Sequence, residues 1–82
     1  SASYPNPFTV KTTIPFSLSR TAEVTIEVVN MQGRRISSGS MRVLPPGEHD
    51  WTWIPDATAA GNYLVHITAG SESTTMQVIF LR

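Results

Sequence analysis

Apolar and polar residues alternate along most of the chain. Between positions 10 and 18 every second residue is apolar or a threonine, with Lys, Thr, Pro and Ser between them. The same alternation returns over residues 22–28, 49–53, 63–67 and 76–80. A period of two with one apolar face is the pattern of a half-buried strand, and no segment repeats apolar residues at helical spacing over three turns. The pattern therefore predicts an all-β protein.

Residues typical of turns separate these runs. They are Ser19-Arg20-Thr21, Asn30-Met31-Gln32-Gly33, Gly39-Ser40, Pro45-Pro46-Gly47, the long loop 55–61 and Ala69-Gly70-Ser71-Glu72. We expect Gly39-Ser40 to divide this part of the chain into two short strands, over residues 34–38 and 41–44. The result is seven short strands spaced about eight to twelve residues apart, which indicates a sandwich or a barrel.

Two strands depart from the simple alternation. Pro15 has no backbone N–H to give to a neighbouring strand, so the first strand is expected at a sheet edge, or to switch sheets there. The last strand carries Val78-Ile79-Phe80-Leu81 and is apolar on both faces. Such a strand is expected to be central in its sheet or to be covered by something else. If it lies uncovered at the surface, it is a site for pairing and aggregation.

Length and composition exclude several classes of protein. Eighty-two residues allow a single domain, and six basic residues balance six acidic ones. The largest basic cluster is the pair Arg34–Arg35, which gives no basic face for a nucleic acid. The absence of cysteine excludes disulfides, thiolate metal sites and cysteine nucleophiles. No apolar run approaches the roughly 18 residues of a membrane span.

The residues that most often carry chemistry are too scattered to form a catalytic or metal site. His49 and His66 fall in different predicted strands, without the spacing of zinc ligands. Glu23 and Glu27 lie on one polar strand face, roughly 13 Å apart, which is too far for a glycosidase pair. No serine stands in a nucleophile motif. We therefore expect no catalytic residue, no cofactor and no metal. The chain is not expected to be an enzyme.

The residues alone do not decide between a binding role and a structural role at two places. Glu48, Asp50 and Asp56 flank one strand and are candidate calcium ligands together with loop carbonyls. Trp51 and Trp53 share a strand face and are either a platform for stacking sugars or part of the core. The core is favoured for the tryptophans, because large aromatic side chains dominate the cores of small domains.

Five short motifs carry a family likeness. In chain order they are Tyr4-Pro5-Asn6-Pro7-Phe8 followed by Thr12-Thr13-Ile14, Asn30-Met31-Gln32-Gly33-Arg34, Pro46-Gly47-Glu48-His49 leading to Trp53, Ala60-Gly61-Asn62-Tyr63, and a final apolar strand ending in Arg82. In this order and spacing they resemble the type IX secretion C-terminal sorting domain, type A. The likeness covers positions 4 to 82.

Two departures from the family pattern accompany this likeness. The family often carries a W-D-G-x-D-x-x-G loop, whereas Trp53 is followed here by Ile54-Pro55-Asp56-Ala57 and a shorter loop. The last strand usually carries Lys or Arg before its apolar run, but residues 73–77 are uncharged here. The resemblance therefore does not support a contact of that strand based on charge.

The resemblance implies a seven-stranded antiparallel immunoglobulin-like β-sandwich with a role in transport. It implies one C-terminal sorting domain over residues 1–82, with residues 1–8 as an extended entry segment. We expect Tyr4 and Phe8 to act as pegs into the end of the domain. The implied partners are an N-terminal cargo domain, the outer-membrane translocon and a sortase-like peptidase that removes the domain. The protein would pass through the periplasm to the cell surface or the medium, with the cargo attached to surface lipopolysaccharide.

A compact domain that ends in an apolar strand offers a sheet edge to which a partner adds a strand. We therefore expect the signal to lie in Met76, Gln77, Val78, Ile79, Phe80, Leu81 and Arg82. A homodimer through an edge or terminal strand is a further expectation. Gly33 and Gly61 are expected to serve the backbone, Gly33 at a positive φ and Gly61 where the chain turns into a strand, more than direct recognition.

Two other functions compete with sorting. One is a structural or adhesive immunoglobulin-like module, similar to flagellar hook-capping or fibronectin-like domains. The other is a carbohydrate-binding module that uses Trp51 and Trp53. A fold by itself does not decide among them.

Overall fold

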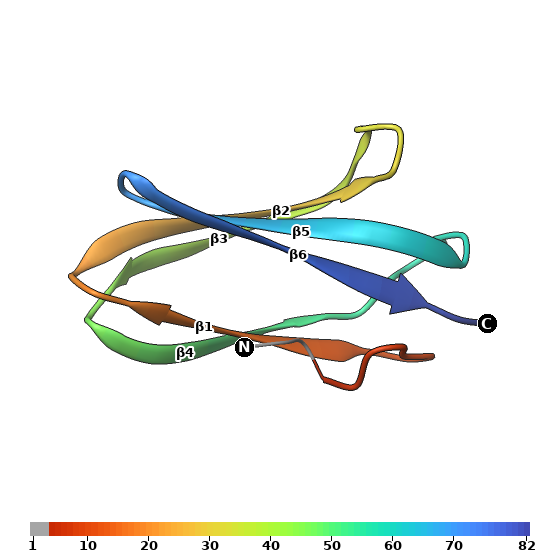
Figure 1. Cartoon of the computed structure of the whole chain (residues 1–82), viewed down its shortest axis with the longest axis horizontal. Helices are drawn as coiled ribbons and strands as arrows, with labels where there is room; N and C mark the ends of the chain where they lie inside the picture. The colour runs from red at the N-terminus through yellow and green to blue at the C-terminus, as the bar shows by residue number, and fades with distance from the viewer. Residues whose placement is uncertain (1–3) are drawn as a thin grey trace.

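Two antiparallel sheets face each other in a computed structural model that describes residues 4–82, apart from the side chains of residues 40 and 41. The strands are β1 (Thr12–Leu18), β2 (Ala22–Asn30), β3 (Arg35–Leu44), β4 (Gly47–Trp53), β5 (Gly61–Ala69) and β6 (Glu72–Phe80). One sheet is the pair β1-β4, and the other has the order β3-β2-β5-β6 (Figure 1). The prediction of an all-β antiparallel immunoglobulin-like sandwich is confirmed.

The core lies between the sheets and is built from the alternating residues. Each strand that the alternation predicted contributes buried side chains to this core. Those that are at most 8% exposed are Ile14, Phe16, Leu18, Val24, Ile26, Val28, Trp53, Tyr63, Val65, Ile67, Val78 and Phe80. Because successive side chains of a strand point to opposite faces, the period of two places one set of residues in the core. Val10, which continues the first run, lies before β1 and is 68% exposed.

The chain forms one strand over Arg35–Leu44, where the sequence predicts two within residues 34–44. Gly39 lies inside β3 and pairs with Ile26 of β2. The reason is a close approach by Trp51 of the opposite sheet: a Cβ on Gly39 would stand 3.3 Å from the Trp51 indole nitrogen. A glycine within a strand therefore marks packing against a large side chain here, and the described residues hold six named strands.

β1 is an edge strand, as Pro15 predicts. Thr13 exchanges both backbone hydrogen bonds with Tyr4, so its N–H and C=O face away from β4. Pro15 is two residues further along and faces the same way, where a missing N–H costs no bond to β4.

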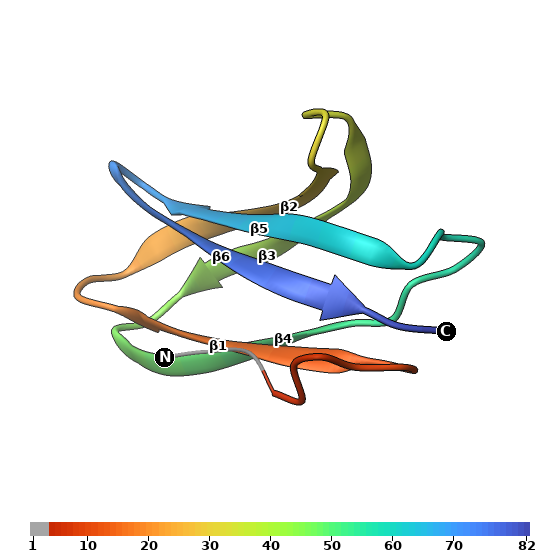
Figure 2. The same cartoon turned by 45° about the vertical axis from the view of Figure 1, so that its right-hand side comes forward.

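β6 is also an edge strand, at the end of the four-stranded sheet (Figure 2). Of the two alternatives for an apolar last strand, a central place is therefore wrong, and cover by another segment is found along the strand's outer edge but not on its outer face, where Leu81 is 45% exposed. The cover comes from the entry segment, because Phe8 forms a parallel bridge with Phe80 and is itself 2% exposed.

Candidate functional site

Segments far apart in the sequence meet at one end of the sandwich, which we call the C-terminal end. It holds the segment 4–11, the β2–β3 turn 31–34, the β4–β5 loop 54–60 and residues 81–82 (Figures 1 and 2). The opposite end, which we call the hairpin end, holds the connections β1–β2, β3–β4 and β5–β6. Four of the five family motifs described above therefore lie at the C-terminal end.

Four aromatic rings form the interior of the C-terminal end. Phe8 stacks on Phe80 with a centroid distance of 5.2 Å and meets Trp53 edge-on at 5.7 Å. Trp53 meets Tyr63 edge-on at 5.4 Å, and the Tyr63 hydroxyl donates to the carbonyl of Ala59. Each such aromatic pair adds about 0.5–1.5 kcal/mol beyond the area that it buries. The cluster joins the entry segment to β4, β5 and β6.

The entry segment hydrogen-bonds directly to the outer edge of β6. Phe8 N donates to Ile79 O at 2.9 Å, and Leu81 N donates to Phe8 O at 2.8 Å. The side chain of Asn6 completes the contact: its Oδ1 accepts from Ile79 N at 2.8 Å, and its Nδ2 donates to Gln77 O at 3.1 Å. The edge of β6 from Gln77 to Leu81 is therefore already bonded within the chain.

The same segment is tied to β1 on its other side. Tyr4 forms an antiparallel bridge with Thr13, and the fully buried hydroxyl of Thr12 donates to the Pro5 carbonyl at 2.7 Å. The peptide bonds before Pro5 and Pro7 are cis. The prediction that both aromatics are pegs is confirmed for Phe8 and wrong for Tyr4, which is 56% exposed because it lies at the outer edge of β1. Residues 1–3 of the predicted entry segment lie outside the described residues.

Asn30 fixes the β2–β3 turn. Its Oδ1 accepts from the backbone N–H of Gln32 at 3.0 Å and of Arg34 at 2.9 Å, and its own N–H donates to Arg34 O. Gly33 N donates to Asn30 O, and Gly33 has a φ of 85°, which confirms the predicted positive φ. The motif Asn-x-x-Gly-Arg is therefore a local hydrogen-bonding unit.

The C-terminal residues contact the β4–β5 loop and the start of β5. The Arg82 guanidinium donates to Thr58 O at 2.9 Å, and Gln77 Nε2 donates to Asn62 Oδ1 at 3.1 Å. Next to Asn62, Gly61 lines an open hollow of about 290 Å³ together with residues of the β2–β3 turn. The structure thus brings Gln77, Arg82 and Gly61 to one surface, with Gly33 in the adjoining turn.

The other predicted signal residues divide between interior and edge. Val78 and Phe80 are buried and Met76 packs against the core, so these three face away from solvent. Ile79 is half-buried on the outer face and Leu81 is 45% exposed. The side chains that a partner reaches directly are therefore those of Gln77, Leu81 and Arg82.

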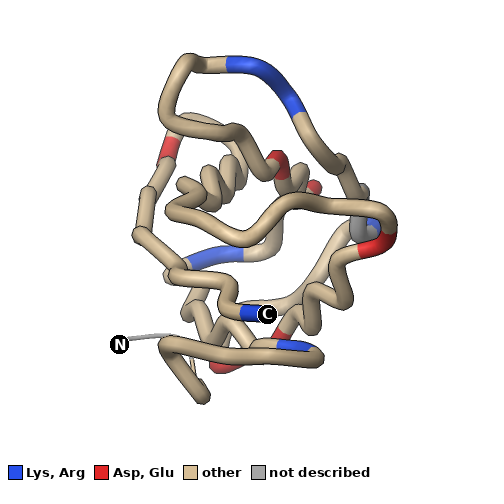
Figure 3. Tube along the Cα trace, turned by 90° about the vertical axis from the view of Figure 1, so that its right-hand side faces the viewer, with Lys and Arg blue, Asp and Glu red and all other residues tan. Residues whose placement is uncertain are grey.

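The histidines and carboxylates serve local structure. His49 Nε2 bonds with Pro45 O at 2.8 Å, and His66 Nδ1 bonds with Thr75 Oγ1 at 2.7 Å. Glu27 lies 3.7 Å from Arg35 in an exposed ion pair, a kind worth at most about 1 kcal/mol. In Figure 3 the basic and acidic positions are spread along the trace. Within residues 4–82, no three His, Cys, Asp or Glu side chains gather as a group that could hold a metal ion.

The tryptophans belong to the core, as predicted. Trp53 is 3% exposed, and Trp51 is half-buried against Gly39 and the core. A platform for stacking sugars needs exposed ring faces, which the buried Trp53 does not offer. Over the part of the chain that the structure describes, no helix is long and apolar enough to cross a membrane.

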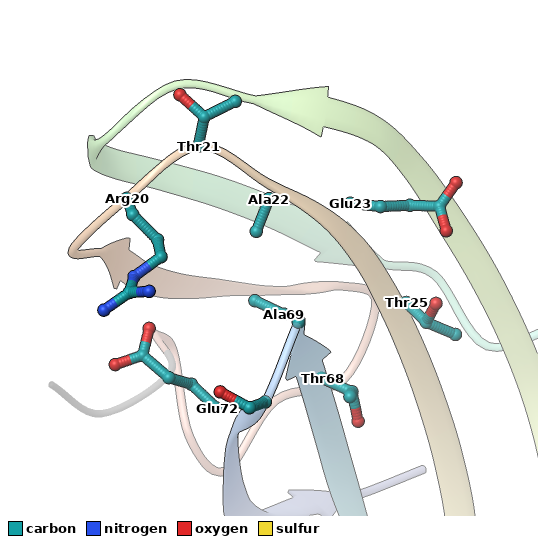
Figure 4. Close-up of a pocket in the computed structure, with 10 residues that line it drawn as sticks. Arg20, Thr21, Ala22, Glu23, Thr25, Thr68, Ala69 and Glu72 are labelled. Carbon is teal, nitrogen blue, oxygen red and sulfur yellow. The ribbon is translucent and has the colours of Figure 1, made fainter.

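The hairpin end has an open hollow of about 440 Å³ between the β1–β2 turn and the β5–β6 hairpin. Ala22 and Ala69 lie along it, and the side chains of Arg20 and Glu72 point toward one another at one side (Figure 4). Ser19 Oγ donates to Glu72 Oε1 at 3.0 Å.

Sequence reasoning missed Asn6 and Thr12 as the residues that attach the entry segment. Two signals were available. Asparagine hydrogen-bonds readily to backbone groups, and Asn6 stands between two prolines that offer no N–H of their own. Thr12 occupies a core-facing position, where a buried hydroxyl needs a partner.

Comparison with known proteins agrees with these observations. Residues 2–81 match the family model described as the secretion system C-terminal sorting domain. Neither the comparison with curated proteins nor that with solved structures found a match. Members of this family are sorting signals and not a class of enzymes; they act with the secretion system on an N-terminal cargo and direct export to the cell surface or outside. The chain belongs to the family of secretion system C-terminal sorting domains and is a type IX secretion sorting signal.

Proposed function

We propose that the outer-membrane translocon of the type IX system recognises this domain in its folded state, at the C-terminal end of the sandwich. The observation that carries the proposal is that Gln77 and Arg82 bond to Asn62 and Thr58, beside the hollow that Gly61 shares with the Asn30 turn. These residues are far apart in the sequence. A translocon that binds this surface therefore recognises the domain only when it has folded. An unfolded chain does not present them together.

The remaining partners and steps follow the same proposal. A sortase-like peptidase removes the domain from its cargo, and the cargo is attached to surface lipopolysaccharide after passing through the periplasm. Residues 1–82 act as one unit without catalytic activity, cofactor or metal, and residues 1–8 are its entry segment. A homodimer forms through an edge strand. Gly33 and Gly61 shape the backbone of the recognised end, and Met76–Arg82 carries the signal.

The test is the export of a reporter. A fluorescent protein with a standard signal peptide is fused ahead of residues 1–82 in a host with the type IX machinery. Deleting Met76–Arg82 should abolish export, but it also removes the buried Val78 and Phe80, so misfolding has the same result. The sharper variant is therefore Gln77→Ala with Arg82→Ala, which keeps the core. We expect a strong loss of export while the domain stays folded.

The matched control lies at the hairpin end. Ser19→Ala with Glu72→Gln also removes a hydrogen bond between two exposed side chains, but far from the proposed surface. We expect normal export for this control. Equal export of both double variants, or export that persists without the translocon, would contradict the proposal.

A further inference from the structure

The outer edge of β6 is divided into a bonded half and an open half. Ile79 directs its N–H and C=O toward the entry segment. Alternate residues of an antiparallel strand direct their backbone groups to the same side, so Ser73, Thr75 and Gln77 face the same edge. Among the described residues, no backbone hydrogen bond from another segment reaches this edge at Ser73 or Thr75. The entry segment thus covers only the apolar half, from Gln77 to Leu81.

Asn6 takes the place of a strand residue on this edge. A paired strand would offer one N–H and one C=O to its neighbour, and the Asn6 amide offers one donor to Gln77 O and one acceptor to Ile79 N. Pro5 and Pro7 flank it and have no backbone N–H. The Asn6 side chain therefore satisfies two backbone groups of the β6 edge, Gln77 O and Ile79 N, where the neighbouring prolines supply no N–H donor.

Beyond Glu72, β6 lacks the charged residues and prolines that protect other sheet edges. From Ser73 to Leu81 the chain has no charged residue and no proline, which are the usual means of preventing contact between edges. β1, by contrast, carries Pro15 on its outer edge. Val78, Ile79 and Phe80 add strong β propensity. The entry segment is thus what shields the apolar half of this edge.

We propose that the entry segment is a releasable cap, anchored by Phe8 and fastened to the strand edge by Asn6, that keeps the Gln77–Leu81 edge of β6 from pairing with a second copy of this chain. An uncharged edge meets an identical edge without repulsion between like charges, and two antiparallel β6 strands satisfy each other through a twofold axis. The edge already accepts a strand in cis, since Phe8 bonds to Ile79 and Leu81. Release of the cap frees the same groups for a strand in trans.

This inference rests on the proposed homodimer and on no step of export. Its test therefore uses the purified full chain, so a negative export experiment leaves it standing. In the wild type, hydrogen exchange should be slow for the amides of Ile79 and Leu81 and fast for Ser73 and Thr75. Fast exchange at Ile79 and Leu81 in the wild type would overturn the proposal.

The decisive variant is Asn6→Ala, studied by hydrogen exchange and by sedimentation over a concentration series. We expect exchange at Ile79 to be about tenfold faster in the monomer, as the loss of one hydrogen bond implies, and dimers at concentrations where the wild type is monomeric. Far-UV circular dichroism confirms that the variant is folded. A folded Asn6→Ala protein that stays monomeric throughout would refute the cap.

Two further variants keep the test specific. Asn6→Asp retains the acceptor for Ile79 N but places an oxygen against Gln77 O, so its dimerisation should be intermediate. Adding Gln77→Lys to Asn6→Ala places a charge on the edge and should restore the monomer. Dimers of the double variant as strong as those of Asn6→Ala would show that another surface pairs, and would overturn the proposal.

Discussion

The two ends of the sandwich are built in different ways. At the hairpin end, β5 and β6 are joined by only Gly70 and Ser71, with a φ of 62° at Gly70. At the C-terminal end, the connections are held by side chains: Asn6 bonds to β6, Asn30 bonds within its turn and Arg82 bonds to the β4–β5 loop. The comparison teaches that a turn of two residues needs little sequence information, whereas an end assembled from distant segments needs specific side chains. The motifs of the chain therefore concentrate at the C-terminal end.

The largest effect is expected from Phe8→Ala. Phe8 is 2% exposed and contacts both Trp53 and Phe80, so its truncation leaves a cavity and should lower the free energy of unfolding by about 3–5 kcal/mol. Urea unfolding followed by tryptophan fluorescence measures this loss. Tyr4→Ala is the matched control in the same segment, because the Tyr4 ring is 56% exposed, and it should cost less than about 1 kcal/mol. Equal losses for the two variants would show that Phe8 is no special anchor.

An intermediate effect is expected from Asn30→Ala. The substitution removes the acceptor of the Gln32 and Arg34 amides, which lie at the surface and turn to water, so the cost should be about 1–2 kcal/mol. Thermal unfolding provides the measurement. Asn30→Asp keeps an acceptor oxygen and should retain most of the stability. If both substitutions destabilise equally, the hydrogen bonds to Oδ1 are not what holds the turn.

The smallest effect is expected at the hairpin end, from Ser19→Ala. Its hydroxyl bonds to Glu72 in full contact with solvent, so the change in the free energy of unfolding should stay within about 0.5 kcal/mol. The same urea titration reports it. A loss above about 1 kcal/mol would mean that the hairpin end also depends on specific side chains, and the contrast between the two ends would fail.

The sequence predicts the strands well because the alternation is set by burial on one face. Ile14, Ile26 and Val65 are all fully buried where the period of two places them. Prediction from the sequence fails where the role of a residue depends on a partner that is distant along the chain. Gly39 resembles a turn residue until Trp51 is known to lie against it, and no local pattern reveals that contact. Predicting it requires the pairing of the sheets.

The candidate site is predictable to a similar extent. The turn at Asn30 and Gly33 can be inferred from its own five residues, because all of its hydrogen bonds are local. The partners of Asn6 are 71 and 73 residues away, so its role depends on the complete topology. The sequence indicated that the last strand is either central or covered, and only the fold identifies the entry segment as the cover of its outer edge.

The bond between Phe8 and β6 also has a mechanical consequence. The entry segment runs parallel to the last strand at Phe8 and Phe80. A force that pulls the chain ahead of Tyr4 against Arg82, in opposite directions along the strands, loads their hydrogen bonds in shear, so that these bonds resist together. A hairpin such as β5–β6 peels open one bond at a time when its two ends are pulled apart. Tension between a cargo and a held C-terminal strand is therefore borne by the Tyr4–Thr13 bridge and by this short parallel contact before it reaches the rest of the sandwich.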